Sequence, residues 1–102
     1  MSKPILEIAL LDVIPGKESE FEQSFARAQE IIASMPGYLG HELQRCIETP
    51  NRYALLVRWQ TLEDHTDGFR NSPQYKEWKE LLHRFYDPFP VVEHYRPIYE
   101  GT

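Results

Sequence analysis

The sequence predicts an α+β fold of the ferredoxin-like type, a sandwich in which a four-stranded antiparallel sheet carries both helices on one face. Strand-like and helix-like segments follow one another in the order βαββαβ, which is the order of that sandwich. Two consecutive strand-like segments are joined by a short turn, which favours antiparallel pairing. The 102 residues contain no internal repeat and no linker, so we expect one domain over residues 1–102.

The first half of the chain predicts a strand and a helix. Residues 5–14 are a branched apolar run that Pro15 and Gly16 bring to an end, as expected of a strand followed by a turn. Residues 17–34 have an apolar stripe at helical spacing, formed by Phe21, Phe25, Ala28 and Ile32. We expect this helix to stop at residues 35–37, which read Met-Pro-Gly.

A hairpin and a broken helical region follow. Strands are expected at residues 38–48 and 53–59, separated by a Thr-Pro-Asn turn. A short helix begins at Thr61 and is interrupted at Gly68. A second helix starts at Ser72 with an apolar stripe formed by Tyr75, Trp78, Leu82 and Phe85. Residues 91–96 form the last predicted strand.

The apolar strands predict a second copy of the chain. Residues 5–14 and 53–59 are apolar at both odd and even positions, so both faces of these strands require cover. Two helices cover only one face of a sheet. Because a two-fold dimer is the commonest soluble oligomer, we expect a homodimer that buries the other face.

Composition excludes several classes of function. The net charge of −5 opposes sequence-independent binding to nucleic acid, which needs clustered Lys and Arg. No apolar run approaches the ~20 residues that span a bilayer. The N-terminal residues show no export signal, and Cys46 is the only cysteine, which excludes an internal disulfide and a thiolate metal cluster. We therefore expect a cytoplasmic protein without a membrane partner.

Four stretches of the sequence resemble the antibiotic biosynthesis monooxygenase (ABM) domain. They are residues 14–18 (IPGKE), 35–40 (MPGYLG), 53–59 (YALLVRW) and 65–75 (HTDGFRNSPQY). The resemblance implies a homodimer that forms an α+β barrel, with one pocket per subunit between the sheet and the helices. It also implies oxygenation of a small aromatic, quinol or polyketide-type compound without a cofactor or metal, because the electron-rich substrate itself reduces O₂.

Such chemistry needs a group that removes a proton from an acidic phenol or enol inside an apolar pocket. Histidine suits this step because its unperturbed pKa is near ~6.5. We select His65 as the catalytic base and His94 as the second choice. His65 could instead be a buried histidine with a structural role, and alternation alone does not say which face of the last strand carries His94. His41 is equally ambiguous, and His83 is expected on a solvated helix face.

Aromatic residues supply the candidate walls of the pocket. They make up 13% of the chain, and ten of the 13 lie from Tyr53 onward. The substrate-binding candidates surround the break between the two predicted C-terminal helices and the end of the second: Trp59, Phe69, Arg70, Tyr75 and Tyr86. A flat ligand could occupy the gap that an interrupted helix leaves beside a sheet. The alternatives are that the rings belong to the core and that Arg70 is a surface charge.

One departure from the family and one rival function limit the functional prediction. The haem-degrading branch of the family uses an Asn, Trp and His constellation, and the matching positions here are Ala9, Phe69 and Lys79. We therefore do not expect haem degradation by that mechanism. No histidine spacing typical of a metal site occurs, nor a phosphate-binding glycine loop. The rival to an oxygenase is a non-catalytic dimer that binds a small hydrophobic molecule.

Overall fold

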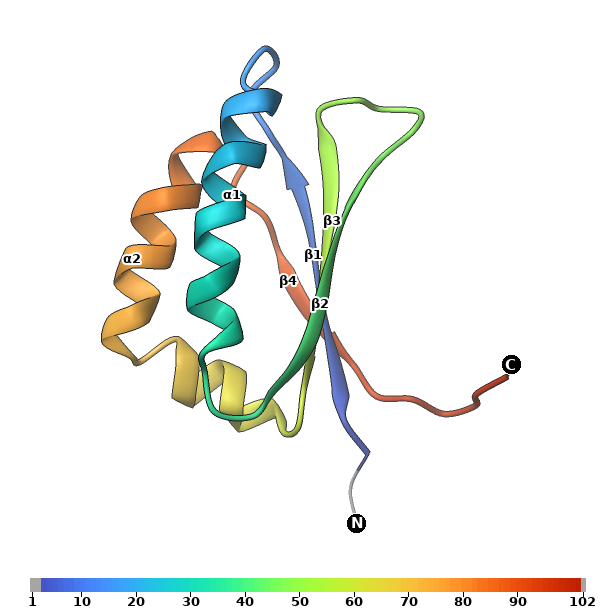
Figure 1. Ribbon diagram of the computed structural model, residues 1–102. Helices are drawn as coiled ribbons and strands as arrows, with labels where there is room; N and C mark the ends of the chain where they lie inside the picture. The colour runs from blue at the N-terminus through green and yellow to red at the C-terminus, as the bar shows by residue number, and fades with distance from the viewer. Residues whose placement is uncertain (1–2, 102) are drawn as a thin grey trace.

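The computed structural model describes residues 3–101 and confirms the predicted α+β fold (Figure 1). The elements in chain order are β1 (Ile5–Asp12), α1 (Glu18–Ala33), β2 (Tyr38–Arg45), β3 (Arg52–Trp59), the π-helical segment η1 (Asp64–Phe69), α2 (Pro73–Leu82), the 3₁₀ segment η2 (His83–Phe85) and β4 (Val92–Tyr95). Both helices lie on one face of the sheet (Figure 1).

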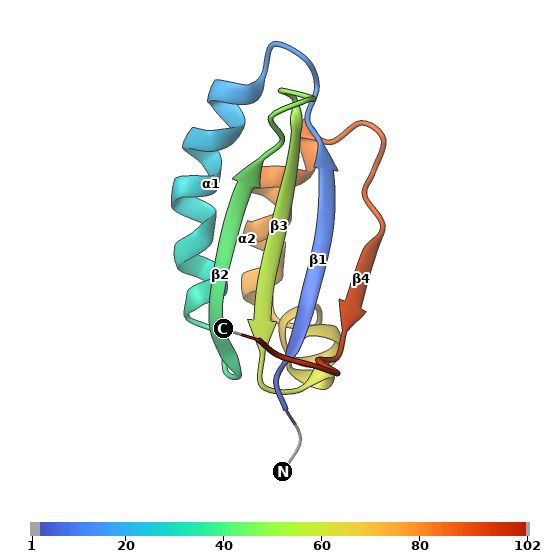
Figure 2. The same ribbon diagram turned by 90° about the vertical axis from the view of Figure 1, so that its right-hand side faces the viewer.

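The four strands form one antiparallel sheet in the order β2-β3-β1-β4. β1 is therefore central, between β3 and the short edge strand β4 (Figure 2). The register pairs Glu7 with Val57 of β3 on one side and with His94 of β4 on the other. Since paired residues project to the same face of a sheet, Glu7 and His94 lie on the same face.

The core fills the layer between the sheet and the helices. Every second residue of β1 and β3 is buried there, and the predicted helical stripes supply the other half. Phe21, Phe25, Ala28 and Ile32 of α1 are all buried, as are Trp78 and Leu82 of α2. The packing confirms the periodicity from which both helices were predicted.

The edge strands are shorter than predicted. β2 ends at Arg45 rather than at residue 48, and β4 covers Val92–Tyr95 rather than residues 91–96. A register shift between Tyr38 and Gly40 marks a bulge that leaves Leu39 exposed. Leu39 consequently does not share the inward face of His41, because a bulge interrupts the two-residue alternation of a strand.

The face of the sheet opposite the helices is open in the single chain (Figure 2). β1 and β3 place an apolar strip on it: Leu6, Ile8, Leu10, Ala54 and Leu56. Leu10 is 54% exposed. After β4 the chain continues on this open side (Figure 1), where Ile98 and Tyr99 are exposed. None of the helices within residues 3–101 has the length and hydrophobicity needed to cross a membrane.

Candidate active site

A pocket of about 390 Å³ lies between the helix-facing side of the sheet and the segments η1 and α2. This volume is within the range of sites for small organic ligands. The sheet supplies Glu7, Ala9, Leu11, Leu55 and Val92 to its lining. The helices and the loop that precedes β4 supply the remainder, which includes five aromatic rings besides two histidines.

Glu7 is the charged residue at the floor of this pocket. It occupies an inward position of β1, in the series Ile5, Glu7, Ala9 and Leu11, and is only 5% exposed. The indole Nε1 of Trp59 donates a hydrogen bond to its Oε1 at 2.9 Å. A buried carboxyl requires such partners because transfer of an unpaired charge from water is costly. The strand alternation thus forces one acidic group into an otherwise apolar layer.

The π-helical turn of η1 places His65 beside Glu7. The backbone nitrogen of Arg70 donates to the carbonyl of His65 at 3.1 Å, a bond that closes the wide turn. Such turns are frequent at functional sites. Here the wide turn directs both His65 and Phe69 to the core, where they are 4% and 1% exposed. Leu62 lies in the helical turn that precedes this segment and is exposed.

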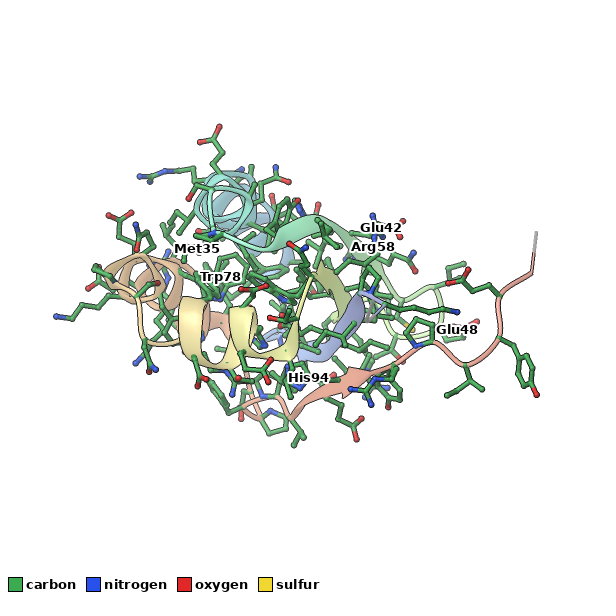
Figure 3. The ribbon with its side chains drawn as sticks, turned by 90° about the horizontal axis from the view of Figure 1, so that it is seen from below. Met35, Glu42, Glu48, Arg58, Trp78 and His94 are labelled. Carbon is green, nitrogen blue, oxygen red and sulfur yellow. The ribbon has the colours of Figure 1, made fainter. Side chains whose placement is uncertain are left out.

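His65 contacts a polar group through each ring nitrogen. Its Nε2 lies 3.4 Å from Oε1 of Glu7, and its Nδ1 lies 2.7 Å from Nε2 of His94. The imidazole also stacks on the ring of Trp59, with centroids 5.4 Å apart and planes at 18°. Figure 3 shows His94 on β4 beside the helical segment η1. The orientation of the His65 ring is therefore fixed by three neighbours.

Burial sets the ionisation of these groups. It raises the pKa of Glu7 to about 7, against smaller lowering effects of the Trp59 hydrogen bond and the positive charge of Arg70. Burial also lowers the pKa of His65 to about 3, with Arg70 and His94 adding to the effect, and lowers the pKa of His94. Both effects have the same cause, since a low-dielectric site disfavours the charged form. Near neutral pH, His65 is neutral and Glu7 exchanges its proton readily.

The rest of the pocket lining combines a cation with aromatic rings. Arg70 lines the pocket and forms no ion pair with any side chain of residues 3–101. Tyr75 packs edge-on against Phe69 at 5.2 Å between centroids. His83 packs edge-on against Phe89, with centroids 4.9 Å apart, and both line the pocket. The site can thus receive a flat apolar molecule with one anionic group.

The sequence-predicted residues fall into two layers. His65, Phe69, Arg70, Tyr75 and Tyr86 line the pocket directly. Trp59 and His94 stand behind that lining, where each contacts a residue that belongs to it. His83 was expected on a solvated face but is half-buried in the wall, because α2 gives way to the 3₁₀ segment η2 at this residue.

Sequence reasoning missed Glu7. Its signal was present, since Glu7 is the one charged residue at the alternate positions 5, 7, 9, 11 and 13 of a strand that is otherwise apolar there. An acid in such a series cannot reach water and must have a buried partner. Among residues 3–101, no three side chains of His, Cys, Asp or Glu converge as metal ligands would.

Comparisons with known proteins agree with this geometry. The family described as antibiotic biosynthesis monooxygenase matches residues 4–81. The protein YczJ of Bacillus subtilis, described as uncharacterized, is 53% identical over 94 residues, which cover 92% of this chain and 99% of the relative. A haem oxygenase (mycobilin-producing) of Mycobacterium tuberculosis is 30% identical over 70 residues, which cover 69% of this chain and 66% of the relative.

Solved structures extend the similarity. A Bordetella bronchiseptica protein described by the same family name is 35% identical, with a TM-score of 0.91 over 97% of this chain and all of the other. SnoaB, a cofactor-independent oxygenase from Streptomyces nogalater, is 22% identical, with a TM-score of 0.75 over 99% of this chain and 97% of the other. The second similarity concerns the fold alone. The match over residues 4–81, together with these relatives, shows that the chain belongs to the antibiotic biosynthesis monooxygenase (ABM) family.

Proposed function

We propose that this protein is a cofactor-independent monooxygenase of a small aromatic, quinol or polyketide-type compound. The observation that carries the proposal is the contact between Glu7 and His65 at the floor of an apolar, aromatic-walled pocket. Burial of an acid and an imidazole in an apolar layer costs stability, even where each has a polar partner. Perturbed titratable groups that line a cavity are typical of catalytic sites.

The chemistry requires removal of a proton from an acidic hydroxyl or an activated C–H group. The buried groups at the pocket floor accept it, with His65 oriented by Trp59 and by His94. The resulting anion is stabilised by the guanidinium of Arg70, which lines the pocket. That anion gives electrons to O₂ and a C–O bond forms, which leaves a peroxide on the substrate carbon. The remaining hydrogen of that carbon is then lost as a proton, and its electron pair forms a C=O bond as the O–O bond breaks. One oxygen atom stays in the product, and the other leaves as water.

The walls favour a flat substrate. Phe69 and Tyr75 pack edge-to-face against one another, as do Tyr86 and Phe89, and all four rings line the cavity. A planar ligand between such rings gains both apolar burial and favourable ring contacts. The volume of about 390 Å³ suits two or three fused rings and does not require a chain-like ligand.

Haem degradation is not proposed, although one relative is a haem oxygenase. Two of the positions that match the haem-degrading constellation, Ala9 and Phe69, offer only carbon atoms to the pocket. The third, Lys79, is exposed on α2 and does not line it. Both ring nitrogens of His65 already face polar partners.

The proposal includes a homodimer. The apolar strip of β1 and β3 is uncovered in the single chain, and Leu10 alone leaves 54% of its surface in water. Packing of two such faces about a two-fold axis would complete an α+β barrel. The pocket lies on the opposite, helix-covered side, so each subunit would keep its own site.

Oxygen uptake tests the enzymatic part of the proposal. The purified protein is incubated with naphthohydroquinone, anthrone and related phenols under labelled O₂, and uptake is recorded beside product mass. We expect uptake above the protein-free rate and one labelled atom in the product. His65→Ala should lose most of this rate, whereas His41→Ala, which alters a histidine outside the pocket, should retain it.

Two results would contradict an oxygenase. One is uptake no faster than the protein-free rate for every compound of the panel. The other is full activity of the His65→Ala variant. Saturable quenching of Trp59 fluorescence by naphthoquinone without any oxygen uptake would instead support a non-catalytic binding protein, the rival function. For that measurement the Trp78→Phe variant leaves Trp59 as the single indole.

A further inference from the structure

A line of polar atoms connects the floor of the pocket with the edge of the sheet. It runs from Oε1 of Glu7 to Nε2 of His65 over 3.4 Å, and from Nδ1 of His65 to Nε2 of His94 over 2.7 Å. Glu7 and His65 line the pocket, whereas His94 does not. His94 is only half-buried on β4, the edge strand, so part of this residue is accessible to solvent.

The contact between His65 and His94 requires that the two imidazoles share one hydrogen. Two neutral rings at 2.7 Å can bond only if one nitrogen donates and the other accepts. A proton that arrives at Nε2 of His65 therefore allows the hydrogen on Nδ1 to move to His94. The ring of His65 connects its two neighbours without itself holding a lasting charge.

We propose that Glu7 is the proton acceptor of the pocket and that His65 and His94 conduct its proton to solvent at the edge of the sheet. This proposal rests on the proposed function for the origin of the proton. It reassigns the direct acceptor from His65 to Glu7. It also gives His94, which does not touch the cavity, a definite role as the exit group.

The transfer balances without another reactant. The substrate hydroxyl gives its proton to the carboxylate of Glu7. The Glu7 carboxyl then passes a proton to Nε2 of His65, the Nδ1 proton moves to Nε2 of His94, and Nδ1 of His94 releases one to water. After the product leaves, water in the pocket takes the Nε2 proton of His65, the shared hydrogen returns from Nε2 of His94 to Nδ1 of His65, and Nδ1 of His94 regains a proton from solvent, so the two rings return to their first tautomers.

The charged and titratable neighbours suit this direction of transfer. Glu7 is faced by Trp59 from β3, by His65 and Arg70 from the η1 region, by His94 from β4, and more distantly by Tyr75 and Tyr86. Burial raises the pKa of Glu7 to about 7 and holds that of His65 at about 3. Glu7 can therefore both take and release a proton near neutral pH, and His65 does not retain it.

A bound ligand makes a second route necessary. Glu7 is 5% exposed, and its carboxyl meets water through the pocket that the ligand would occupy. A substrate that fills the pocket covers the carboxyl from that side. The histidine pair then provides the route by which the proton can leave while the anion remains bound.

The proposal is tested by a pH titration of the ligand-free protein with nitrogen-labelled histidine and tryptophan. The indole N–H resonance of Trp59 reports ionisation of Glu7, because it donates to that carboxyl. The ring nitrogen shifts of His65 and His94 report their tautomers. We expect all three signals to change with one midpoint, as His65 moves its hydrogen from Nδ1 to Nε2 when Glu7 ionises.

Three variants sharpen the titration. Glu7→Gln should abolish the change at all three residues. His65→Gln should leave the change at Trp59 and abolish the matching change at His94, since the connection is interrupted. His41→Gln, a histidine that hydrogen-bonds Gln29 outside the path, should alter none of them. A purely structural His65 would hold one tautomer throughout.

Different midpoints for Trp59 and His94 in the wild-type protein would overturn the proposal, and this result needs no variant to fold. An unchanged His94 transition in Glu7→Gln would overturn it too. These outcomes do not depend on turnover. Absence of oxygen uptake would contradict the proposed monooxygenase. The titration would still decide whether Glu7, His65 and His94 exchange a proton.

Discussion

The indole of Trp59 donates a hydrogen bond to Oε1 of Glu7 at 2.9 Å within the buried layer between the sheet and the helices. Trp59 is completely buried, and Glu7 is nearly so. The bond favours the ionised carboxylate, but burial opposes it more strongly and raises the pKa of Glu7 to about 7. The stability of the fold is consequently linked to the ionisation of its pocket.

Glu7→Gln should stabilise the protein in alkaline solution. As the pH rises from 4.5 through 7, the unfolded chain ionises Glu7 before the folded one does, so stability is lost over that window. At about 1.4 kcal/mol per pKa unit, the unfolding free energy falls by ~3 kcal/mol once the pH is above this window. Urea unfolding, measured below and above this pH window, should therefore show that Glu7→Gln raises the unfolding free energy on the alkaline side and hardly changes it below pH 4.5.

Glu93→Gln is the matched control, since Glu93 is an exposed carboxyl on the same sheet. It should show little difference at either pH. An equal gain for Glu7→Gln at both pH values would mean that the effect arises from packing rather than from ionisation.

Gly37→Ala should destabilise the turn between α1 and β2 more than Gly16→Ala destabilises the turn after β1. Both glycines have positive φ angles, 84° and 93°, a conformation that costs an alanine about 1–2 kcal/mol. A Cβ at Gly37 would in addition overlap the carboxylate of Asp64, while a Cβ at Gly16 would have no neighbouring atom within 4 Å.

The extra cost at Gly37 has a defined cause. Asp64 must move, and it would lose the hydrogen bond that its Oδ2 accepts from the backbone nitrogen of Thr61 at 3.1 Å. We expect the two variants to differ by at least about 1 kcal/mol in unfolding free energy. Equal losses of unfolding free energy in the two variants would show that Asp64 can move away from the new methyl group at no cost.

Phe69 and Phe89 both line the pocket but should respond differently to truncation. Phe69 is 1% exposed, and Phe69→Ala should cost about 3–5 kcal/mol in unfolding free energy. Phe89 is 62% exposed, so Phe89→Ala should change stability by less than about 1 kcal/mol. The variant should nevertheless bind naphthoquinone about tenfold more weakly, as measured by fluorescence quenching, because one wall of the pocket is lost.

Substitution of Ile98 provides the comparison for Phe89. Ile98 is exposed on the segment after β4 and does not line the pocket. Ile98→Ala should therefore bind naphthoquinone as the wild type does. Unchanged affinity in Phe89→Ala would place the ligand elsewhere.

Leu10→Glu should separate the proposed dimer. Leu10 lies on the open face of β1, and a charge there would be buried without a partner in a sheet-to-sheet interface. Sedimentation at micromolar concentration should give twice the chain mass for the wild type and the chain mass for the variant. Leu62→Glu, which changes an exposed leucine next to η1, should remain dimeric. A monomeric wild type would contradict the dimer directly.

The alternation and spacing of apolar residues predicted the order of the elements and the faces of both helices. Capping and turn-forming residues also predicted where the helices begin and end. Ser72 caps α2 by accepting a hydrogen bond from the backbone nitrogen of Tyr75 at 3.2 Å. The errors lie where tertiary contacts act over short stretches. The bulge at Leu39 and the π-turn of η1 each add a residue to a regular pattern, and neither has a local sequence signal.

The sequence by itself determined that aromatic rings gather around the interrupted helix that carries His65, because composition and spacing are properties of adjacent residues. It did not determine that Glu7 is the partner of His65, or which face of β4 carries His94. The first depends on how η1 packs against β1, and the second on the pairing of β1 with β4, which joins residues more than eighty positions apart in the chain. Alternation divides a strand into two faces, and only the register with its neighbours decides which face meets the pocket.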